Sequence, residues 1–167
     1  ILADALGRRM PLLHRSLDAV IVASTEADSI KALERVLAWH SPRKVFWAAF
    51  PSENPYARAV RTAAYEAKTE LITMETGDAI MIDDEVTLQL LAQSRKGSAF
   101  LLSWRRFRAL LLCGIDDSML TSLVKNSNLG RISVIWLGKN AARTDLPLAW
   151  FARLQPLSIL VSAPSAQ

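Results

Sequence analysis

The segment from Leu17 to Leu33 constrains the fold more than any other part of the chain. Near its start lies Val20-Ile21-Val22, a β-branched run that is typical of a buried strand. From Ile30 onward its apolar residues recur three or four positions apart, which is typical of a helix that packs by one face. A buried strand followed directly by an amphipathic helix is the first unit of an α/β fold. We expect this helix to begin near Ile30, with Asp28 or Ser29 as its N-cap.

The same alternation of short apolar strands and amphipathic helices continues to the end of the chain. A second helix begins at Asn54-Pro55, an N-cap followed by proline at the first helical position. The strands between residues 70 and 113 are separated only by short turns, so neighbouring strands are expected to pair antiparallel, with Arg105-Arg106 at a hairpin tip. The predicted strands are residues 17–23, 44–49, 70–75, 79–82, 86–92, 99–104, 107–113, 132–137 and 157–162, and the predicted helices are residues 2–10, 30–41, 55–68, 116–125 and 146–154.

The composition is that of an ordinary globular protein, because 51% of the 167 residues are hydrophobic and 22% are charged. This length suits one domain, so we expect a single domain over residues 1–167. The apolar runs are far shorter than the about 20 residues that a membrane-spanning helix needs. The one cysteine, Cys113, excludes an internal disulfide and is expected in the core. A net charge of +4 permits contact with a nucleic acid or an anionic surface.

Three segments carry recognisable motifs in a fixed order. Ala23–Leu33 contains S-T-E-A-D-S, Phe107–Asp116 ends in L-L-L-C-G-I-D, and Ser133–Ala142 contains V-I-W-L-G-K-N. The first is similar to T-H-P-D-A-D-H, the second to F-L-L-T-G-D, and the third to a strand followed by H-H-G-S. These patterns, in this order, belong to the metallo-β-lactamase superfamily. The chain most closely resembles the C-terminal domain of ComEC-type competence proteins, which are DNA-uptake channels.

This resemblance implies an α/β fold, namely an αββα sandwich of mixed sheets, in a fragment of a longer membrane protein. The family's first strands, which carry D-V-G-Q-G-D and D-G-G, have no counterpart in the chain. Either the sandwich lacks them or they precede Ile1. The resemblance also implies the transmembrane part of the parent protein as a partner, and a membrane-associated domain on the extracytoplasmic face. The sequence does not determine the oligomeric state.

The resemblance places the family's metal-site positions at residues that are mostly poor metal ligands. A serine hydroxyl is a weak substitute for imidazole on zinc, and a lysine puts a cation where a ligand is needed. We therefore expect no catalytic residue, no metal and no cofactor, which describes a pseudoenzyme. Glu26 and Asp28 have an alternative role, in which their carboxylates cap a helix start and interact favourably with the helix dipole. The positions are Ser24, Glu26, Asp28, Ser29, Ile115, Asp116, Lys139 and Asn140.

Single-stranded DNA is a second expected partner, because several cations lie near aromatic residues along the chain. Such neighbours suit single strands, in which the bases stack and the phosphates pair with cations. The alternative is a set of ordinary solvated faces. The helix 55–68 is expected to bury Tyr56 and to expose its cations. The candidate DNA contacts are Arg58, Arg61, Arg105, Arg106, Arg108 and Lys139.

Two other functions remain open. A rearranged site of Glu26, Asp28 and Asp116 would bind manganese or another hard cation and act as a phosphodiesterase or nuclease. A protein-interaction module without DNA binding is the other alternative. The two histidines, His14 and His40, lie outside the three motifs and are expected in structural or solvated positions.

Overall fold

The computed structural model describes residues 17–50, 54–114, 116, 119–121, 123, 129–138 and 148–162, with the backbone alone at residues 28, 29, 148 and 149. The chain divides into two compact units, Ile1–Met74 and Glu75–Gln167, called here the N-terminal and C-terminal units. The predicted helix 2–10 lies outside the described residues.

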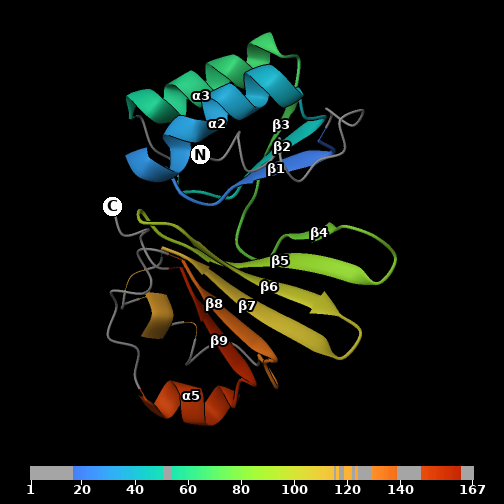
Figure 1. Cartoon of the computed structure of the whole chain (residues 1–167), viewed down its shortest axis with the longest axis vertical. Helices are drawn as coiled ribbons and strands as arrows, with labels where there is room; N and C mark the ends of the chain where they lie inside the picture. The colour runs from blue at the N-terminus through green and yellow to red at the C-terminus, as the bar shows by residue number, and fades with distance from the viewer. Residues whose placement is uncertain are drawn as a thin grey trace. The chain divides into compact units, whose positions relative to one another are not determined.

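Within residues 17–50 and 54–74, the N-terminal unit forms a three-stranded parallel sheet with two helices on one face (Figure 1). The strand order is β1-β2-β3, and α2 and α3 are the connections between successive strands. In the register, Val20 lies beside Val45, which lies beside Leu71. The bounds are β1 Ala19–Val22, α2 Ala27–His40, β2 Lys44–Trp47, α3 Pro55–Glu66 and β3 Glu70–Thr73. All five elements were predicted, because their apolar periodicity is local.

Helix α2 begins three residues earlier than predicted. Its N-cap is Glu26, whose side chain makes no capping hydrogen bond, so the expectation of Asp28 or Ser29 as the N-cap is wrong. The backbone is extended at Glu26 and helical from Ala27, and therefore both predicted caps fall inside the first turn. The helix ends as expected before Pro42, with Ser41 in the left-handed conformation at φ 35°.

The core of the N-terminal unit packs the apolar faces of α2 and α3 against the sheet. Helix α3 buries Ala57, Val60 and Ala64, which recur at helical spacing. Tyr56 precedes this stripe by one residue and is 39% exposed, so the prediction that it is buried is wrong. The cluster comprises Val22, Ile30, Leu37, Val45, Trp47, Ala49, Ala57, Val60 and Ala64.

The C-terminal unit is a six-stranded mixed sheet in the order β4-β5-β6-β7-β8-β9. Strands β4 to β7 pair antiparallel, whereas β8 pairs parallel with both β7 and β9. The expected antiparallel pairing of residues 70–75 with 79–82 is wrong. The turn around Gly77 separates two sheets, and β3 pairs parallel with β2 instead. The bounds are β4 Ala79–Met81, β5 Val86–Gln93, β6 Ser98–Trp104, β7 Phe107–Cys113, β8 Val134–Leu137, α5 Leu148–Leu154 and β9 Ser158–Val161.

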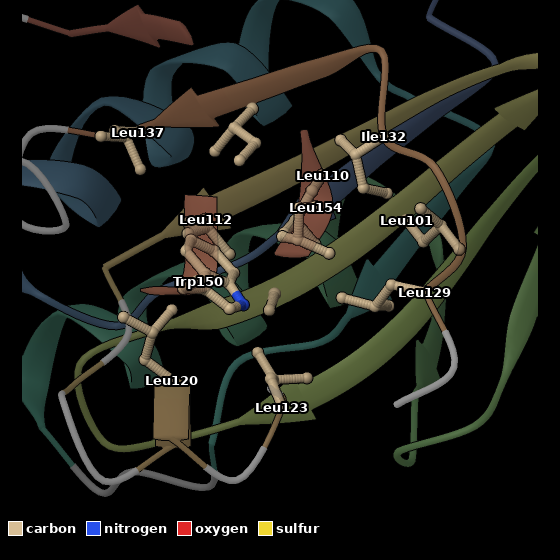
Figure 2. Packing of buried hydrophobic residues seen from close by; sticks show 12 residues of the cluster. Leu101, Leu110, Leu112, Leu120, Leu123, Leu129, Ile132, Leu137, Trp150 and Leu154 are labelled. Carbon is tan, nitrogen blue, oxygen red and sulfur yellow. The ribbon is translucent and has the colours of Figure 1, made fainter. Parts of the chain in front are cut away.

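One face of this sheet forms the larger core (Figure 2). Leu101, Leu110 and Ile135 are neighbours across β6, β7 and β8, so their side chains share a face. Trp150 and Leu154 of α5 pack into the same cluster, which also holds Leu120, Leu123, Leu129 and Ile132. Amphipathic spacing therefore explains why α5 lies against this sheet.

Candidate functional site

The loop between β1 and α2 carries the first group of predicted metal-site positions. The hydroxyl of Ser24 accepts a hydrogen bond from the backbone N–H of Glu26 at 3.2 Å. Thr25 is buried, and Ser24 and Glu26 are half-buried. The serine therefore shapes the turn that leads into α2. The side chains of Asp28 and Ser29 lie outside the described residues, although their backbone is in the first turn of α2.

Asn54 ties this loop to the start of α3. Its Oδ1 accepts from the N–H of Ala57 at 2.7 Å, which is the predicted N-cap. Its Nδ2 donates to the carbonyl of Thr25 at 2.8 Å. One side chain thus joins the loops that follow two neighbouring parallel strands, where α/β proteins commonly place their sites. The cap was visible in the sequence, but the second hydrogen bond joins residues 29 positions apart and left no local signal.

Replacement of Asn54 by alanine is expected to lower the free energy of unfolding by about 2–3 kcal/mol, because it removes both a cap and a half-buried hydrogen bond. Asn54→Asp keeps the capping acceptor but replaces the donor to Thr25 by a carboxylate oxygen, which repels the Thr25 carbonyl, so at least about half of that loss is expected. Urea unfolding followed by circular dichroism measures both variants. An aspartate variant as stable as the parent would mean that the hydrogen bond to Thr25 contributes nothing.

The carboxyl end of β7 carries the second group. Asp116 Oδ1 accepts from the N–H of Met119 at 3.0 Å, and the Asp116 carbonyl accepts from the N–H of Leu120 at 3.0 Å. This carboxylate therefore caps the helical turn that follows β7. The predicted positions Ile115, Lys139 and Asn140 lie outside the described residues.

Two glycines allow the backbone to pack closely beside this strand end. A Cβ on Gly97 would lie 1.7 Å from the carbonyl oxygen of Cys113, and one on Gly138 would lie 3.0 Å from that of Leu112. The N–H of Gly138 donates to the Leu112 carbonyl at 2.9 Å. The close approach of Gly97 leaves no room for a side chain there.

Burial raises the pKa of the Cys113 thiol to about 12. Desolvation disfavours the charged thiolate, which is the form that binds metals and attacks electrophiles. Cys113 is therefore a neutral thiol at physiological pH. It is half-buried at the end of β7 and is not among the residues of the core cluster, where the sequence analysis expected it.

The donors in the described residues do not match the zinc pair that the resemblance implies. Zinc favours imidazole and thiolate ligands, whereas Ser24 offers a neutral hydroxyl. In the part of the chain that the structure describes, no three His, Cys, Asp or Glu residues are grouped to hold a metal ion. We therefore derive no metal-dependent step from these residues.

The hairpin between β6 and β7 has Arg105-Arg106 at its tip, as predicted, with Trp104 opposite Phe107. Arg105 donates from Nε and Nη2 to the two carboxylate oxygens of Glu85, at 2.8 and 2.6 Å. Trp104 Nε1 donates to the same carboxylate at 3.1 Å. The hydrogen bonds from Arg105 and then Trp104 lower the pKa of Glu85. The guanidinium of Arg105, a predicted DNA contact, therefore already pairs with the carboxylate of Glu85.

The other candidate DNA contacts differ in exposure. Arg58 and Arg106 are exposed. Arg61 is half-buried, with its guanidinium 4.6 Å from the ring centroid of Trp47. Arg108 is half-buried. Its Nη1 atom lies 2.7 Å from the position that a Cβ on Gly130 would occupy. Lys139 and His14 lie outside the described residues, and His40 is buried at the end of α2.

Known proteins are similar to this chain in structure but not in sequence. No family model matches the chain, and no curated protein matches it in sequence. The metallo-β-lactamase fold protein YhfI from Bacillus subtilis aligns with a TM-score of 0.56 and 9% identity, over 97% of this chain and 80% of that one. The fold is that of the metallo-β-lactamase proteins. Human tRNase Z, short form, gives a TM-score of 0.56 and 8% identity, over 98% of this chain and 83% of that one.

This likeness confirms the predicted α/β fold with mixed sheets. At 8–9% identity, the likeness shows that the fold is shared, but it does not show that the site residues or the activity are shared. No helix within the described residues is both long and apolar enough to cross a membrane.

Proposed function

We propose that the chain is a metallo-β-lactamase-fold domain without hydrolytic activity, serving a competence-type DNA-uptake protein as a structural or single-stranded-DNA-contacting domain. The observation that carries the proposal is the hydrogen bond from the Glu26 N–H to the Ser24 hydroxyl. At this position the ComEC-type pattern has a histidine, and here the side chain supports a turn. Asp116 supports the same proposal, because its carboxylate caps the turn after β7.

Metal analysis and a nuclease assay test the first half of the proposal. The purified protein, incubated with zinc or manganese and then desalted, is expected to retain well under one equivalent of either metal. Labelled single-stranded DNA is expected to stay intact with zinc, manganese or magnesium. Stoichiometric zinc, together with cleavage that disappears in Ser24→Ala, would refute the proposal.

The DNA-contacting role follows from the resemblance and from the exposed cations Arg58 and Arg106. Contact with phosphates releases counterions, so the affinity for an oligonucleotide should fall steeply as salt rises. The transmembrane part of the parent protein would place the domain at the membrane, on the extracytoplasmic face.

Two other functions make different predictions. A hard-cation phosphodiesterase at Glu26, Asp28 and Asp116 predicts manganese-dependent cleavage that is abolished in Asp28→Ala. Capping by Asp116 speaks against this alternative. A protein-interaction module predicts no salt-sensitive DNA binding, and a measured salt dependence would exclude it.

A further inference from the structure

The outer side of α2 carries two cations between two exposed aromatic side chains. Lys31, Arg35 and Trp39 stand four residues apart and therefore form one row along the helix. The ammonium of Lys31 lies 4.9 Å from the ring centroid of Tyr56, at the start of the neighbouring helix α3. Trp39 is 72% exposed and Tyr56 is 39% exposed. We call these four residues, Tyr56, Lys31, Arg35 and Trp39, the α2 stripe.

The stripe extends along the side of α2 that faces away from the sheet. Helix α2 buries Ile30, Val36 and Leu37, whereas Lys31, Arg35 and Trp39 are exposed. At 1.5 Å per residue, Lys31 and Trp39 are about 12 Å apart along the helix axis. Figure 1 shows α2 and α3 side by side on the same face of the sheet, so the Lys31–Tyr56 contact crosses from one helix to the other.

The chemistry of the stripe favours a ligand that is both planar and anionic. The large apolar side chains exposed on α2 and in the first turn of α3 are Trp39 and Tyr56, both of them aromatic. On β9, in contrast, the exposed large side chains are the aliphatic Ile159, Leu160 and Val161. Aromatic rings offer flat faces on which bases stack, and Lys and Arg pair with phosphates.

The local charge is complementary to a polyanion at the Trp39 end of the stripe. Residues 35–52 contain no acidic residue, whereas Arg35 and Arg43 fall within them. Lys44, in the same segment, pairs with Glu70 of β3 at 3.7 Å. Glu34 is the acidic side chain next to the row. A membrane surface would be expected to engage exposed aliphatic residues as well, and this side of α2 presents only Ala38.

We propose that the α2 stripe is a stacking platform for single-stranded DNA. The Trp39 end of the stripe lies about 18 Å along the helix axis from Ala27, where α2 begins. The inference rests on the proposed function, because it assumes that the domain contacts single-stranded DNA. It assigns that contact to a surface that lies outside the DNA contacts expected from the sequence.

Binding of a fluorescein-labelled 20-residue oligothymidylate to the full chain, followed by anisotropy at several salt concentrations, tests the proposal. Trp39→Ala is expected to weaken binding by about tenfold or more, because it removes one stacking face. Trp39→Phe keeps a ring and should restore most of the affinity. Arg35→Ala should lower the slope of log affinity against log salt by about 0.7, the value for one lost phosphate contact on a single strand.

Two matched variants control for general effects. Tyr65→Ala removes an aromatic side chain that is 84% exposed on α3 and outside the stripe. Arg95→Ala removes one exposed positive charge in the C-terminal unit. Both are expected to bind within about twofold of the parent protein, and an unchanged urea midpoint shows that each variant is folded.

The outcomes separate the inference from the proposed function. DNA binding that is unchanged in Trp39→Ala and Arg35→Ala would overturn the inference and leave DNA contact standing. No binding by the parent protein at low salt would overturn both. An oligouridylate bound at least tenfold more tightly would overturn the assignment to DNA. Binding to vesicles with 30% phosphatidylserine that is lost in Trp39→Ala, without binding to the oligonucleotide, would assign the stripe to a lipid surface instead.

Discussion

Replacement of Gly97 by alanine is expected to lower the free energy of unfolding of the C-terminal unit by about 3 kcal/mol or more. A Cβ at this position would stand 1.7 Å from the carbonyl oxygen of Cys113 and 2.8 Å from its carbonyl carbon. Both are backbone atoms, which cannot swing aside as a flexible side chain does. The turn that holds Gly97 would have to move away from the end of β7, breaking the pairing of Ser98 with Cys113. Urea unfolding followed by circular dichroism measures the loss.

Gly77→Ala is the matched control for this prediction. A Cβ on Gly77 meets nothing within 4 Å, but its φ of +105° is unfavourable for alanine. The expected cost is therefore backbone strain alone, about 1–2 kcal/mol. Equal losses in the two variants would mean that the close contact at Gly97 relaxes without cost.

The thiol of Cys113 is expected to react with iodoacetamide about a thousandfold more slowly in the native protein than in guanidinium chloride at pH 8. Burial raises the pKa of Cys113 to about 12 from an ordinary value of 9.0. Each unit of pKa lowers the thiolate fraction about tenfold at a pH below both values. A thiol with the ordinary pKa of 9.0 would be largely ionised above pH 9. A native labelling rate that reaches its plateau near that pH would therefore contradict the prediction.

The same shift sets a pH dependence of stability. Because the folded state holds the proton more tightly, this group leaves stability unchanged below about pH 9 and lowers it as the pH rises from about 9 toward 12. Cys113→Ser lacks the shift, since serine does not ionise in this range. The difference in urea midpoint between the parent protein and Cys113→Ser should therefore change across that window and stay constant below it.

Local patterns in the sequence were enough to predict most elements of the fold. The described strands and helices agree with the predicted ones to within two or three residues, because apolar spacing and capping act between near neighbours. The Asn54-Pro55 helix start is an example. Strand pairing was harder, since it depends on distant contacts. Nothing between residues 70 and 82 signals that β3 and β4 belong to different sheets.

The candidate sites show the same division. Glu85 lies 20 positions before Arg105 and reaches it only through the register that sets Val86 opposite Trp104. The α2 stripe differs, because three of its residues recur every four positions in the sequence. Apolar periodicity indicates only the buried face of a helix, so it gives no signal for cations and aromatic residues on the exposed face. The predicted roles of Ile115, Lys139 and Asn140 stay predictions, because these residues lie outside the described part of the chain.

The sequence by itself determined the order and type of the elements and the residue types at the predicted metal-site positions. These depend on side-chain chemistry and on spacing along the chain. Only the tertiary structure decided which distant side chains meet: Asn54 donates to the carbonyl of Thr25, and Arg105 is bound by Glu85. The reason is physical, because a hydrogen bond depends on distance and direction in space. Sequence separation constrains both only between residues that are close neighbours in the chain.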